Sequence, residues 1–407
     1  MTTEAVHRYD PSAFRDVFEQ HFTYLAGVYR NSHRYAGHPA LHDPASGRRW
    51  SYAELWTDAG ALAAGLRDAG VGPGDAVVFS LFNGGDFVLV WLAAMRLGAV
   101  AAPINFRLSA GEVAHVLDDS RPAAYVYDLA LAATASAALQ RAAHAPGLVA
   151  TVGSGETPAG TVTIESLAGD GSSIPDLPAG ITTYAETTRL YTSGTTGMPK
   201  GVSLSGVVDV LSAHDVIMHF PLSPEDRTLN MTPWFHRGGL YSGGPNPVLY
   251  CGAESVALRA FDPATVLDWV AEHGLTFLIG APTNLAMLTA EQTSRPRDLS
   301  TLRGIVTMGA PLDREACLRY QETLTPRIFN GYGTTEAFWN TFLRPSDLPA
   351  HAGSAGRACT DDDVAVVRIY EDRQADPTDH VAKDGTEVGE VVVRSVKAGY
   401  AYVNQPE

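Results

Sequence analysis

Short apolar runs alternate along this chain with longer segments in which apolar residues recur at helical spacing. Residues 75–82 follow a Gly-Pro-Gly-Asp turn and predict a buried strand, whereas Ala and Leu recur over 52–70 as in an amphipathic helix with Ser51 as its N-cap. Such alternation is typical of a layered α/β fold. The same pattern predicts further strands at 99–104, 123–127, 188–191, 228–233, 254–260, 276–280, 304–308 and 327–330, and further helices at 87–97, 112–118, 207–219, 263–273, 284–292 and 312–324.

Two regions interrupt this alternation. Residues 153–180 are rich in Gly, Ser, Thr and Pro, which predicts a linker between two subdomains. Near the end of the chain, apolar runs at 364–370 and 390–394 are separated by a charged turn, with no helical segment between them. We therefore expect a layered α/β core over residues 1–352 and a small, β-barrel-like subdomain over residues 353–407.

Charge and composition narrow the class of protein. The 407 residues carry 29 Lys and Arg against 45 Asp and Glu, a net charge of −16, which disfavours a nucleic-acid or anionic-membrane surface. The longest apolar stretch, 87–100, contains Arg96 and is too short to cross a bilayer, and residues 1–22 are polar, unlike a signal peptide. The three cysteines lie far apart, as expected of reduced thiols in a cytoplasmic protein.

The most specific motif lies at residues 192–200, where a predicted strand runs into Thr-Ser-Gly-Thr-Thr-Gly-Met-Pro-Lys. Glycines allow backbone N–H groups to converge on an anion, and the hydroxyl groups add further donors. Lys200 supplies a mobile positive charge that suits a phosphate. The segment is not a Walker P-loop, because Lys200 follows Pro199 and precedes Gly201 rather than Ser or Thr. We expect a phosphate-binding loop here rather than a featureless polar loop.

A second motif, Asn-Gly-Tyr-Gly-Thr-Thr-Glu, occupies residues 330–336 at the end of a predicted strand. A Gly-aromatic-Gly turn presents a flat ring where a ligand can approach the backbone closely, although such a turn taken alone is more often structural. The hydroxyl and the carboxylate that follow it suit a phosphate and its Mg²⁺. The motif therefore predicts a nucleotide and metal site only in combination with the phosphate loop.

Two further segments also follow predicted strands. Residues 308–312 read Met-Gly-Ala-Pro-Leu and lead from a strand into a helix. Residues 233–239 read Pro-Trp-Phe-His-Arg-Gly-Gly. Taken alone, His236 is interpreted as a hydrogen-bonded loop residue, and Arg237 is interpreted as a solvated loop cation.

Together these motifs resemble the adenylate-forming family, which contains acyl- and aryl-CoA ligases, luciferases and the adenylation domains of peptide synthetases. The resemblance extends to residues 50–55, 97–108 and 389–407 and covers essentially the whole chain. It implies ATP-dependent activation of a carboxylic acid as an acyl-adenylate, followed by thioester formation with CoA, with Mg²⁺ as cofactor. A CoA ligase is favoured, because 97–108 is typical of such enzymes and 233–244 has no acid to pair with an amino-acid amine.

The resemblance also implies roles for individual residues. Tyr332 is expected to stack on adenine with Asn330 at its amino edge, Thr335 to contact the α-phosphate, and Glu336 to bind Mg²⁺. Lys200, His236, Thr335 and Glu336 are the expected catalytic residues, with His236 positioning the acid. The nucleotide-binding residues implied are Thr192, Ser193, Gly194, Thr195, Thr196, Gly197, Lys200, Gly309, Ala310, Pro311, Asn330, Gly331, Tyr332, Gly333, Thr334 and Thr335. The substrate-binding residues implied are Trp234, Phe235, His236, Gly238, Gly280 and Met308, the last replacing a family glycine and so narrowing or reshaping the acyl tunnel.

The sequence departs from the family pattern at its end. The family's ribose-binding aspartate, hinge and mobile C-terminal domain with its catalytic lysine come after the segment that ends at Glu407. We therefore expect the large N-terminal portion of a longer protein, which binds ATP or an acyl-adenylate but turns over poorly. Three alternatives stay open: transfer of the acyl group to a carrier protein or an amine, thioesterification of an adenylate made elsewhere, and a non-catalytic nucleotide- or acyl-binding module.

Overall fold

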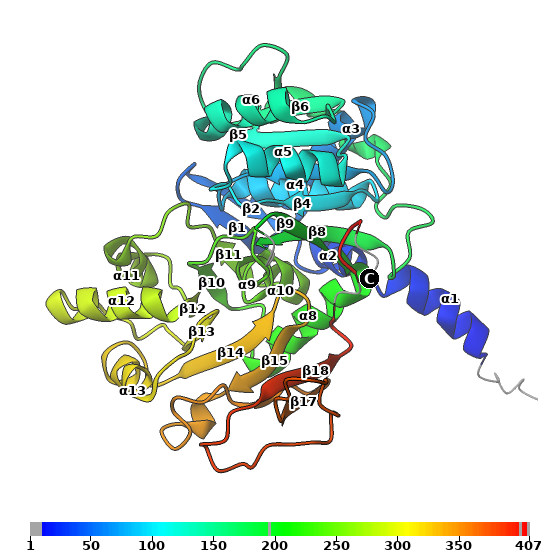
Figure 1. Ribbon diagram of the computed structural model, residues 1–407. Helices are drawn as coiled ribbons and strands as arrows, with labels where there is room; N and C mark the ends of the chain where they lie inside the picture. The colour runs from blue at the N-terminus through cyan, green and yellow to red at the C-terminus, as the bar shows by residue number, and fades with distance from the viewer. Residues whose placement is uncertain (1–9, 194–196, 399–400, 405–407) are drawn as a thin grey trace, which may run out of the picture.

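Two large β-sheets and a two-stranded ribbon frame the computed structural model, which describes residues 10–193, 197–398 and 401–404 (Figure 1). The seven-stranded sheet has the order β7-β6-β5-β3-β4-β8-β9 and is parallel except for the antiparallel pair β8–β9. Its strands are β3 (Ala76–Ser80), β4 (Val100–Pro103), β5 (Ala124–Asp128), β6 (Leu148–Val152), β7 (Val162–Thr163), β8 (Glu186–Ser193) and β9 (Pro199–Ser205).

The nine-stranded sheet has the order β16-β15-β14-β13-β12-β10-β11-β1-β2. Its six central strands are parallel, and antiparallel strands close it at both ends. The strands are β1 (Pro39–Asp43), β2 (Arg48–Ser51), β10 (Arg227–Asn230), β11 (Glu254–Val256), β12 (Phe277–Gly280), β13 (Gly304–Met308), β14 (Ile328–Thr334), β15 (Phe338–Leu343) and β16 (Arg357–Ala358).

Helices cover the faces of both sheets. Those of the first half of the chain are α1 (Pro11–His21), α2 (Tyr24–Arg34), α3 (Tyr52–Asp68), α4 (Gly85–Arg96), α5 (Ala110–Ser120), α6 (Ala132–Arg141) and α7 (Ile164–Leu167). Those of the second half are α8 (Gly206–His219), α9 (Arg237–Tyr241), α10 (Pro245–Cys251), α11 (Pro263–Glu272), α12 (Pro282–Ser294) and α13 (Arg314–Thr323). Short 3₁₀ turns lie at η1 (Leu129–Leu131), η2 (Gly171–Ser173) and η3 (Pro345–Asp347).

Side-chain alternation along the strands divides the core into layers. In β12, Phe277 and Ile279 belong to the inner core that also contains residues of α3, α4, α8 and α10, whereas Leu278 packs with α11, α12 and α13 on the outer face. In β3, Val77 belongs to the inner core and Val78 packs with α5 and α6. The inner helices therefore lie between the two sheets, and the predicted layered α/β fold is confirmed.

The predicted elements recur with shifted ends. The helix predicted over 52–70 is α3, and Ser51 caps it by accepting a hydrogen bond from the Glu54 N–H. The helix predicted at 312–324 begins only at Arg314, because Asp313 is its N-cap. The predicted linker at 153–180 contains β7, α7 and η2. It connects β6 to β8, which belong to the same seven-stranded sheet, so it does not join one sheet to the other.

Two features of composition have structural counterparts. The three cysteines are free thiols, and Cys317 and Cys359 are buried. Among the described helices, none combines the length and the apolar character that a membrane crossing needs.

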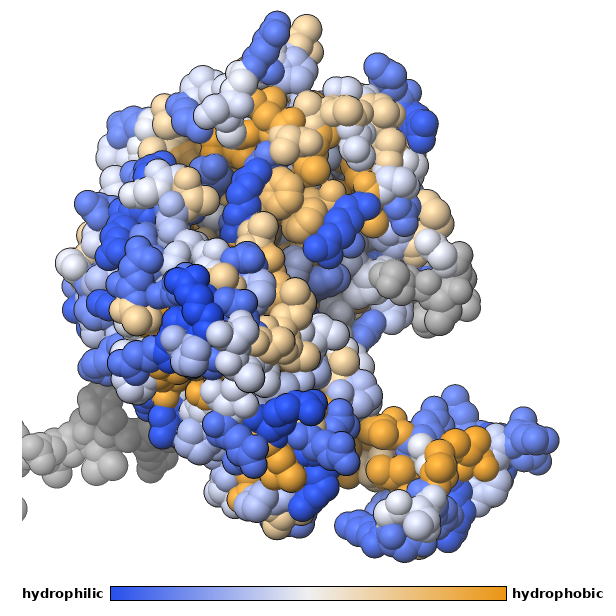
Figure 2. Space-filling model, turned by 90° about the vertical axis from the view of Figure 1, so that its left-hand side faces the viewer, coloured by the Kyte–Doolittle hydropathy of each residue, from blue (hydrophilic) through white to orange (hydrophobic). Residues whose placement is uncertain are grey.

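The small β unit at the end of the chain is the ribbon of β17 (Asp362–Val367) and β18 (Glu390–Ser395). It projects from the lower right of the molecule in Figure 2, where apolar residues lie at the surface. Val366 pairs with Val391, and both are about 40% exposed (39% and 42%). A two-stranded ribbon is marginally stable by itself, so its attachment to the rest of the protein matters.

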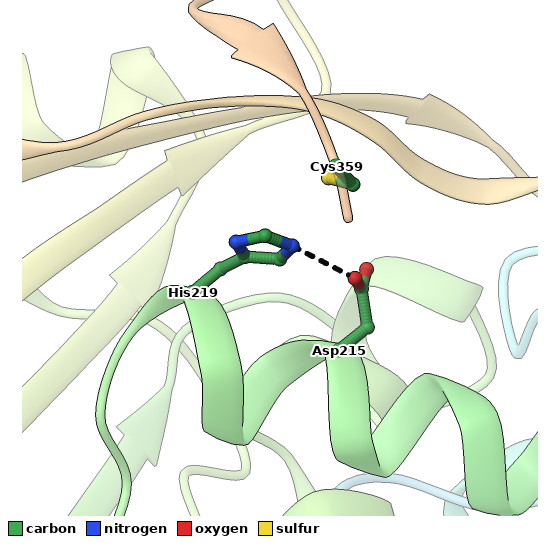
Figure 3. A group of neighbouring side chains, drawn as sticks. All are labelled: Asp215, His219 and Cys359. Atoms are coloured by element: carbon green, nitrogen blue, oxygen red, sulfur yellow. Dashed lines mark ion pairs between the residues drawn. The ribbon is translucent and has the colours of Figure 1, made fainter. Parts of the chain in front are cut away.

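A buried ion network makes that attachment. The Lys397 ammonium, just beyond β18, donates to Asp215 of α8 at 2.8 Å, to Asp362 of β17 at 2.8 Å and to the Trp339 carbonyl at 2.6 Å. His219 Nε2 lies 2.9 Å from the other oxygen of Asp215, and Cys359 lies beside the pair (Figure 3). Asp215, His219 and Cys359 carry side chains of the kinds that bind metal ions. Here, however, the Lys397 ammonium compensates the charge of the Asp215 carboxylate.

Candidate active site

The motifs found in the sequence meet at one edge of the nine-stranded sheet. Strands β13 and β14 are parallel neighbours, so the segment after Met308 and the Gly-Tyr-Gly segment lie side by side at their carboxyl ends. The segment that contains His236 follows β10, which is parallel to β12 in the same sheet. In open α/β sheets, ligands bind at the carboxyl ends of the strands.

A cavity of about 340 Å³ lies at this edge. Predicted nucleotide-binding residues make up most of its wall. The lining residues are Gly309, Ala310, Pro311, Leu312, Asn330, Gly331, Tyr332, Gly333, Gly353, Ser354 and Ala355. Residues 353–355 were not predicted from the sequence, since they lie in a loop that carries no recognisable motif.

One polar and one aromatic side chain in this cavity suit adenine. The Asn330 side chain is buried and donates through Nδ2 to the Ser354 carbonyl, while its Oδ1 has no hydrogen-bond partner among the described residues. An unpaired buried acceptor is costly unless a ligand donates to it. The Tyr332 ring is 39% exposed and available for stacking.

The glycines of this motif are required by the β14–β15 hairpin. A Cβ at Gly333 would lie 1.5 Å from the Phe338 carbonyl oxygen, and one at Gly331 would lie 2.8 Å from Trp339 Nε1. The strands therefore approach too closely for any side chain on this face. Thr335 and Glu336 occupy the turn between the strands, which Thr334 stabilises by accepting the Ala337 N–H.

A second cavity, of about 270 Å³, adjoins the first and shares Gly309, Gly331 and Gly333 with it. Its other lining residues are His236, Arg237, Gly238, Ser242, Met308, Thr334, Thr335, Phe338 and Trp339. The arrangement places a compact, partly aromatic space next to the predicted adenine site and the predicted α-phosphate contact, as an acyl-adenylate would require.

Met308 and Gly238 face each other in this second cavity. A Cβ at Gly238 would lie 3.3 Å from Met308 Sδ, so the methionine fills the space that the glycine leaves. Met308 is 7% exposed and stands at the end of β13. The thioether thus takes up volume in the second cavity.

His236 lies on the wall of the second cavity, next to Phe235, with ring centroids 4.2 Å apart. His236 is itself exposed to solvent at this wall; partial loss of hydration beside the neighbouring protein, and next the charge of Arg107, lower its pKa to about 4. The imidazole is therefore neutral at pH 7, which suits a hydrogen bond to a carboxylic substrate or its adenylate rather than an ion pair.

Three residues predicted to contact the substrate line neither of the two cavities in the described part of the chain. Trp234 is fully buried, packs against Phe87 and donates its backbone N–H to Asn83. Phe235 is 2% exposed. At Gly280, side chains of neighbouring residues fill the space beside the backbone.

The interpretation of Arg237 as a solvated loop cation is wrong. Its side chain is 3% exposed and donates to the Thr335 carbonyl at 2.5 Å, the Ser212 hydroxyl at 3.1 Å and the Lys397 carbonyl at 3.3 Å. Burial lowers its pKa to about 10, which leaves the guanidinium charged at neutral pH. Arg237 therefore fixes the turn that carries Thr335, a role that depends on contacts distant in sequence.

The predicted phosphate loop joins the antiparallel strands β8 and β9. Thr192 and Lys200 are directly paired across this hairpin, and Gly197 has a φ of +87°, which favours glycine. Gly194, Thr195 and Thr196 lie outside the described residues, as does the side chain of Ser193. The described part places Lys200 on the edge strand β9.

Tyr402 connects this hairpin to the turn that carries Glu336. Its hydroxyl donates to Glu336 Oε1 at 2.8 Å, and Lys200 Nζ lies 5.5 Å from the centre of its ring. The hydrogen bond to Glu336 raises the pKa of Tyr402, consistent with its role as donor. No local sequence pattern marks this contact, because Tyr402 and Glu336 are 66 residues apart in the chain.

Comparison with known proteins supports this description. Residues 28–402 match the sequence model of the AMP-binding enzyme family, and the chain belongs to that family. The Feruloyl-CoA synthase of Amycolatopsis sp. is 32% identical over 89% of this chain and 68% of its own length. The indoleacetate–CoA ligase of Aromatoleum aromaticum is 31% identical over 88% of this chain and 67% of its own. The predicted class, an acid–thiol ligase of the adenylate-forming family, is confirmed.

Solved structures confirm the fold. An anthranilate CoA ligase in complex with anthranoyl-AMP superimposes with a TM-score of 0.85 at 23% identity, over 95% of this chain and 72% of that one. The N-terminal domain of FACL13 from Mycobacterium tuberculosis gives 0.78 at 26% identity, over 94% and 92%. The predicted adenylate-forming N-terminal fold is thus correct.

Proposed function

We propose that the chain activates an aromatic carboxylic acid with ATP and supports its transfer to CoA. The observation that carries this proposal is the pair of adjoining cavities, one suited to adenine and one compact and partly aromatic. Gly309, Gly331 and Gly333 lie at their junction, and Thr335 lies on the wall of the second cavity. The acid would lie between Met308, Phe338 and Trp339, close to neutral His236. The Feruloyl-CoA synthase and the indoleacetate–CoA ligase act on aromatic acids by their names, which supports the same class here.

The chemistry follows from the position of these groups. The substrate carboxylate attacks the α-phosphorus of ATP, the bond to the bridging oxygen breaks, and pyrophosphate leaves. Charge develops on phosphoryl oxygens, so Lys200, the Thr335 hydroxyl and the N–H groups of the phosphate loop would stabilise it. The thiolate of CoA then attacks the acyl carbon and releases AMP.

Mg²⁺ fits the residues at the turn. Glu336 and Thr335 offer a carboxylate and a hydroxyl, and oxygen ligands of this kind are those that Mg²⁺ prefers. When bound, the ion would neutralise negative charge that develops on phosphate oxygens. We propose that Glu336 holds the ion. Tyr402 links Glu336 to the hairpin of Lys200, because its hydroxyl donates to Glu336 and its ring lies near the Lys200 ammonium.

The test compares ligand binding and activity in the 407-residue chain. Non-hydrolysable acyl-sulfamoyl adenosines with aromatic or long aliphatic acyl groups are titrated by calorimetry, and pyrophosphate release is measured over the matching acids. We expect tighter binding of the aromatic analogues, and a loss of pyrophosphate release of about 10²-fold in Lys200→Ala and Glu336→Ala.

Exposed residues of the small β unit provide matched controls: Lys383→Ala and Glu371→Ala remove the same charges away from both cavities. Wild-type chain that binds neither class of analogue would contradict the proposal, as would Lys200→Ala and Glu336→Ala variants that bind ATP like wild type. Mass spectrometry of the product distinguishes CoA from a carrier-protein thiol as acceptor.

A further inference from the structure

The last described segment of the chain extends the seven-stranded sheet. Val403 donates its N–H to the Gly201 carbonyl at 2.8 Å, Ser203 donates to the Ala401 carbonyl at 3.3 Å, and Tyr402 forms an antiparallel bridge with Val202. Residues 401–403 therefore lie along β9, the edge strand of the sheet. Backbone pairing of this kind fixes the position and direction of the Tyr402 side chain.

The Asn404 side chain secures the end of this segment. Its Nδ2 donates to the Asp119 backbone carbonyl at 2.8 Å and to the Asp119 side chain at 3.0 Å. Tyr402 is thus held on both sides, by β9 and by the anchor at Asp119. Its ring and hydroxyl are presented to the space between the Lys200 hairpin and the turn that carries Glu336.

We propose that Tyr402 is a positioning residue for the Mg²⁺-binding carboxylate of Glu336. Its hydroxyl engages Oε1, and a carboxylate held at one oxygen keeps the lone pairs of the other for a metal ion. Its ring confines the Lys200 ammonium on the same side. The inference rests on the proposed function, because it needs Glu336 to bind the ion that accompanies ATP.

Groups that orient a ligating carboxylate affect metal affinity without touching the metal. Loss of such a partner typically costs 10- to 100-fold in affinity. Tyr402→Phe removes the hydroxyl and leaves the ring over Lys200, so it separates the two contacts. We expect the free Mg²⁺ concentration that half-saturates ATP binding to rise about tenfold in this variant. ATP binding without Mg²⁺ stays unchanged, because the Lys200 contact is kept.

The experiment is calorimetric titration of ATP into the 407-residue chain over a series of free Mg²⁺ concentrations. The matched control is Tyr370→Phe, which removes a tyrosine hydroxyl that donates to the Asp379 carboxylate in the small β unit. Glu336→Gln and the double variant with Tyr402→Phe complete a cycle, in which Tyr402→Phe has no further effect once the carboxylate is gone. Thermal melting reports whether each variant is folded.

An unchanged Mg²⁺ dependence in Tyr402→Phe overturns the inference, and so does an equal loss of ATP binding with and without Mg²⁺, since that would indicate a structural role. Tyr370→Phe with the same shift as Tyr402→Phe also overturns it. Wild-type chain with no Mg²⁺-dependent ATP binding would instead refute the proposed function on which the inference rests. A shift confined to Tyr402→Phe, and absent in the Glu336→Gln background, supports it.

Discussion

The buried ammonium of Lys397 lies between two carboxylates, and its removal should destabilise the protein strongly. Lys397, Asp215 and Asp362 have side chains that are at most 1% exposed, and each carboxylate lies 2.8 Å from the ammonium. Lys397→Met keeps a similar side-chain length but leaves two buried negative charges facing each other. Breaking a buried ion pair by removing one partner typically costs about 3–5 kcal/mol, because the remaining charge is uncompensated.

The expected change in melting temperature follows from that cost. With an unfolding entropy of about 2.1 cal/mol/K per residue over 407 residues, 4 kcal/mol corresponds to a decrease of about 5 °C. Differential scanning calorimetry measures it. The triple variant Lys397→Met, Asp215→Asn, Asp362→Asn removes all three charges and should recover part of the loss. A single variant that melts within 1 °C of wild type, or a triple variant less stable than the single, would refute the reasoning.

Two further predictions concern the acyl cavity and a buried carboxyl. Met308→Ala opens the space beside Gly238 and should shift affinity by about tenfold toward acyl-sulfamoyl adenosines with a bulkier ring, whereas Met287→Ala on the surface should not; equal selectivity in the two variants would disprove it. Burial raises the pKa of Asp209 to about 7, although the hydrogen bonds that Thr187 and Tyr241 donate to its carboxylate act in the opposite direction. A carboxyl group whose pKa is raised by folding destabilises the folded protein as pH rises. The free energy of unfolding of Asp209→Asn relative to that of wild type should therefore increase by about 3 kcal/mol from pH 5 to pH 8. Urea titrations that give a difference independent of pH would contradict this.

Much of the fold and of the proposed nucleotide site could be predicted from local sequence. Strand β13 begins and ends at the predicted residues, because a short apolar run bounded by glycines allows few other positions for the ends of a strand. At Gly331 and Gly333 the sequence predicted the close approach of a ligand, and the structure adds that backbone and ring atoms of β15 exclude a side chain there. The signal in each case lies within a few residues of the feature that it predicts.

The remaining parts depend on contacts that no local pattern records. Arg237 has the sequence context of a surface loop, yet backbone carbonyls from distant segments accept its hydrogen bonds and allow its burial. Trp234 follows a strand like a pocket residue, but packing against Phe87 places it in the core. Tyr402 reaches Glu336 only because residues 401–403 pair with β9.

These long-range contacts couple the parts of the proposed site mechanically. The guanidinium of Arg237 binds the carbonyls of Thr335 and Lys397, so the turn beside the acyl cavity and the backbone next to the buried ion network share one charged donor. Tyr402 joins the same turn to the phosphate-loop hairpin. A displacement of the turn would therefore strain buried, charge-assisted hydrogen bonds, which are stronger than neutral ones. The turn that carries Thr335 and Glu336 is accordingly held in place before a ligand arrives, and it is this preorganisation that electrostatic stabilisation of a phosphoryl transition state requires.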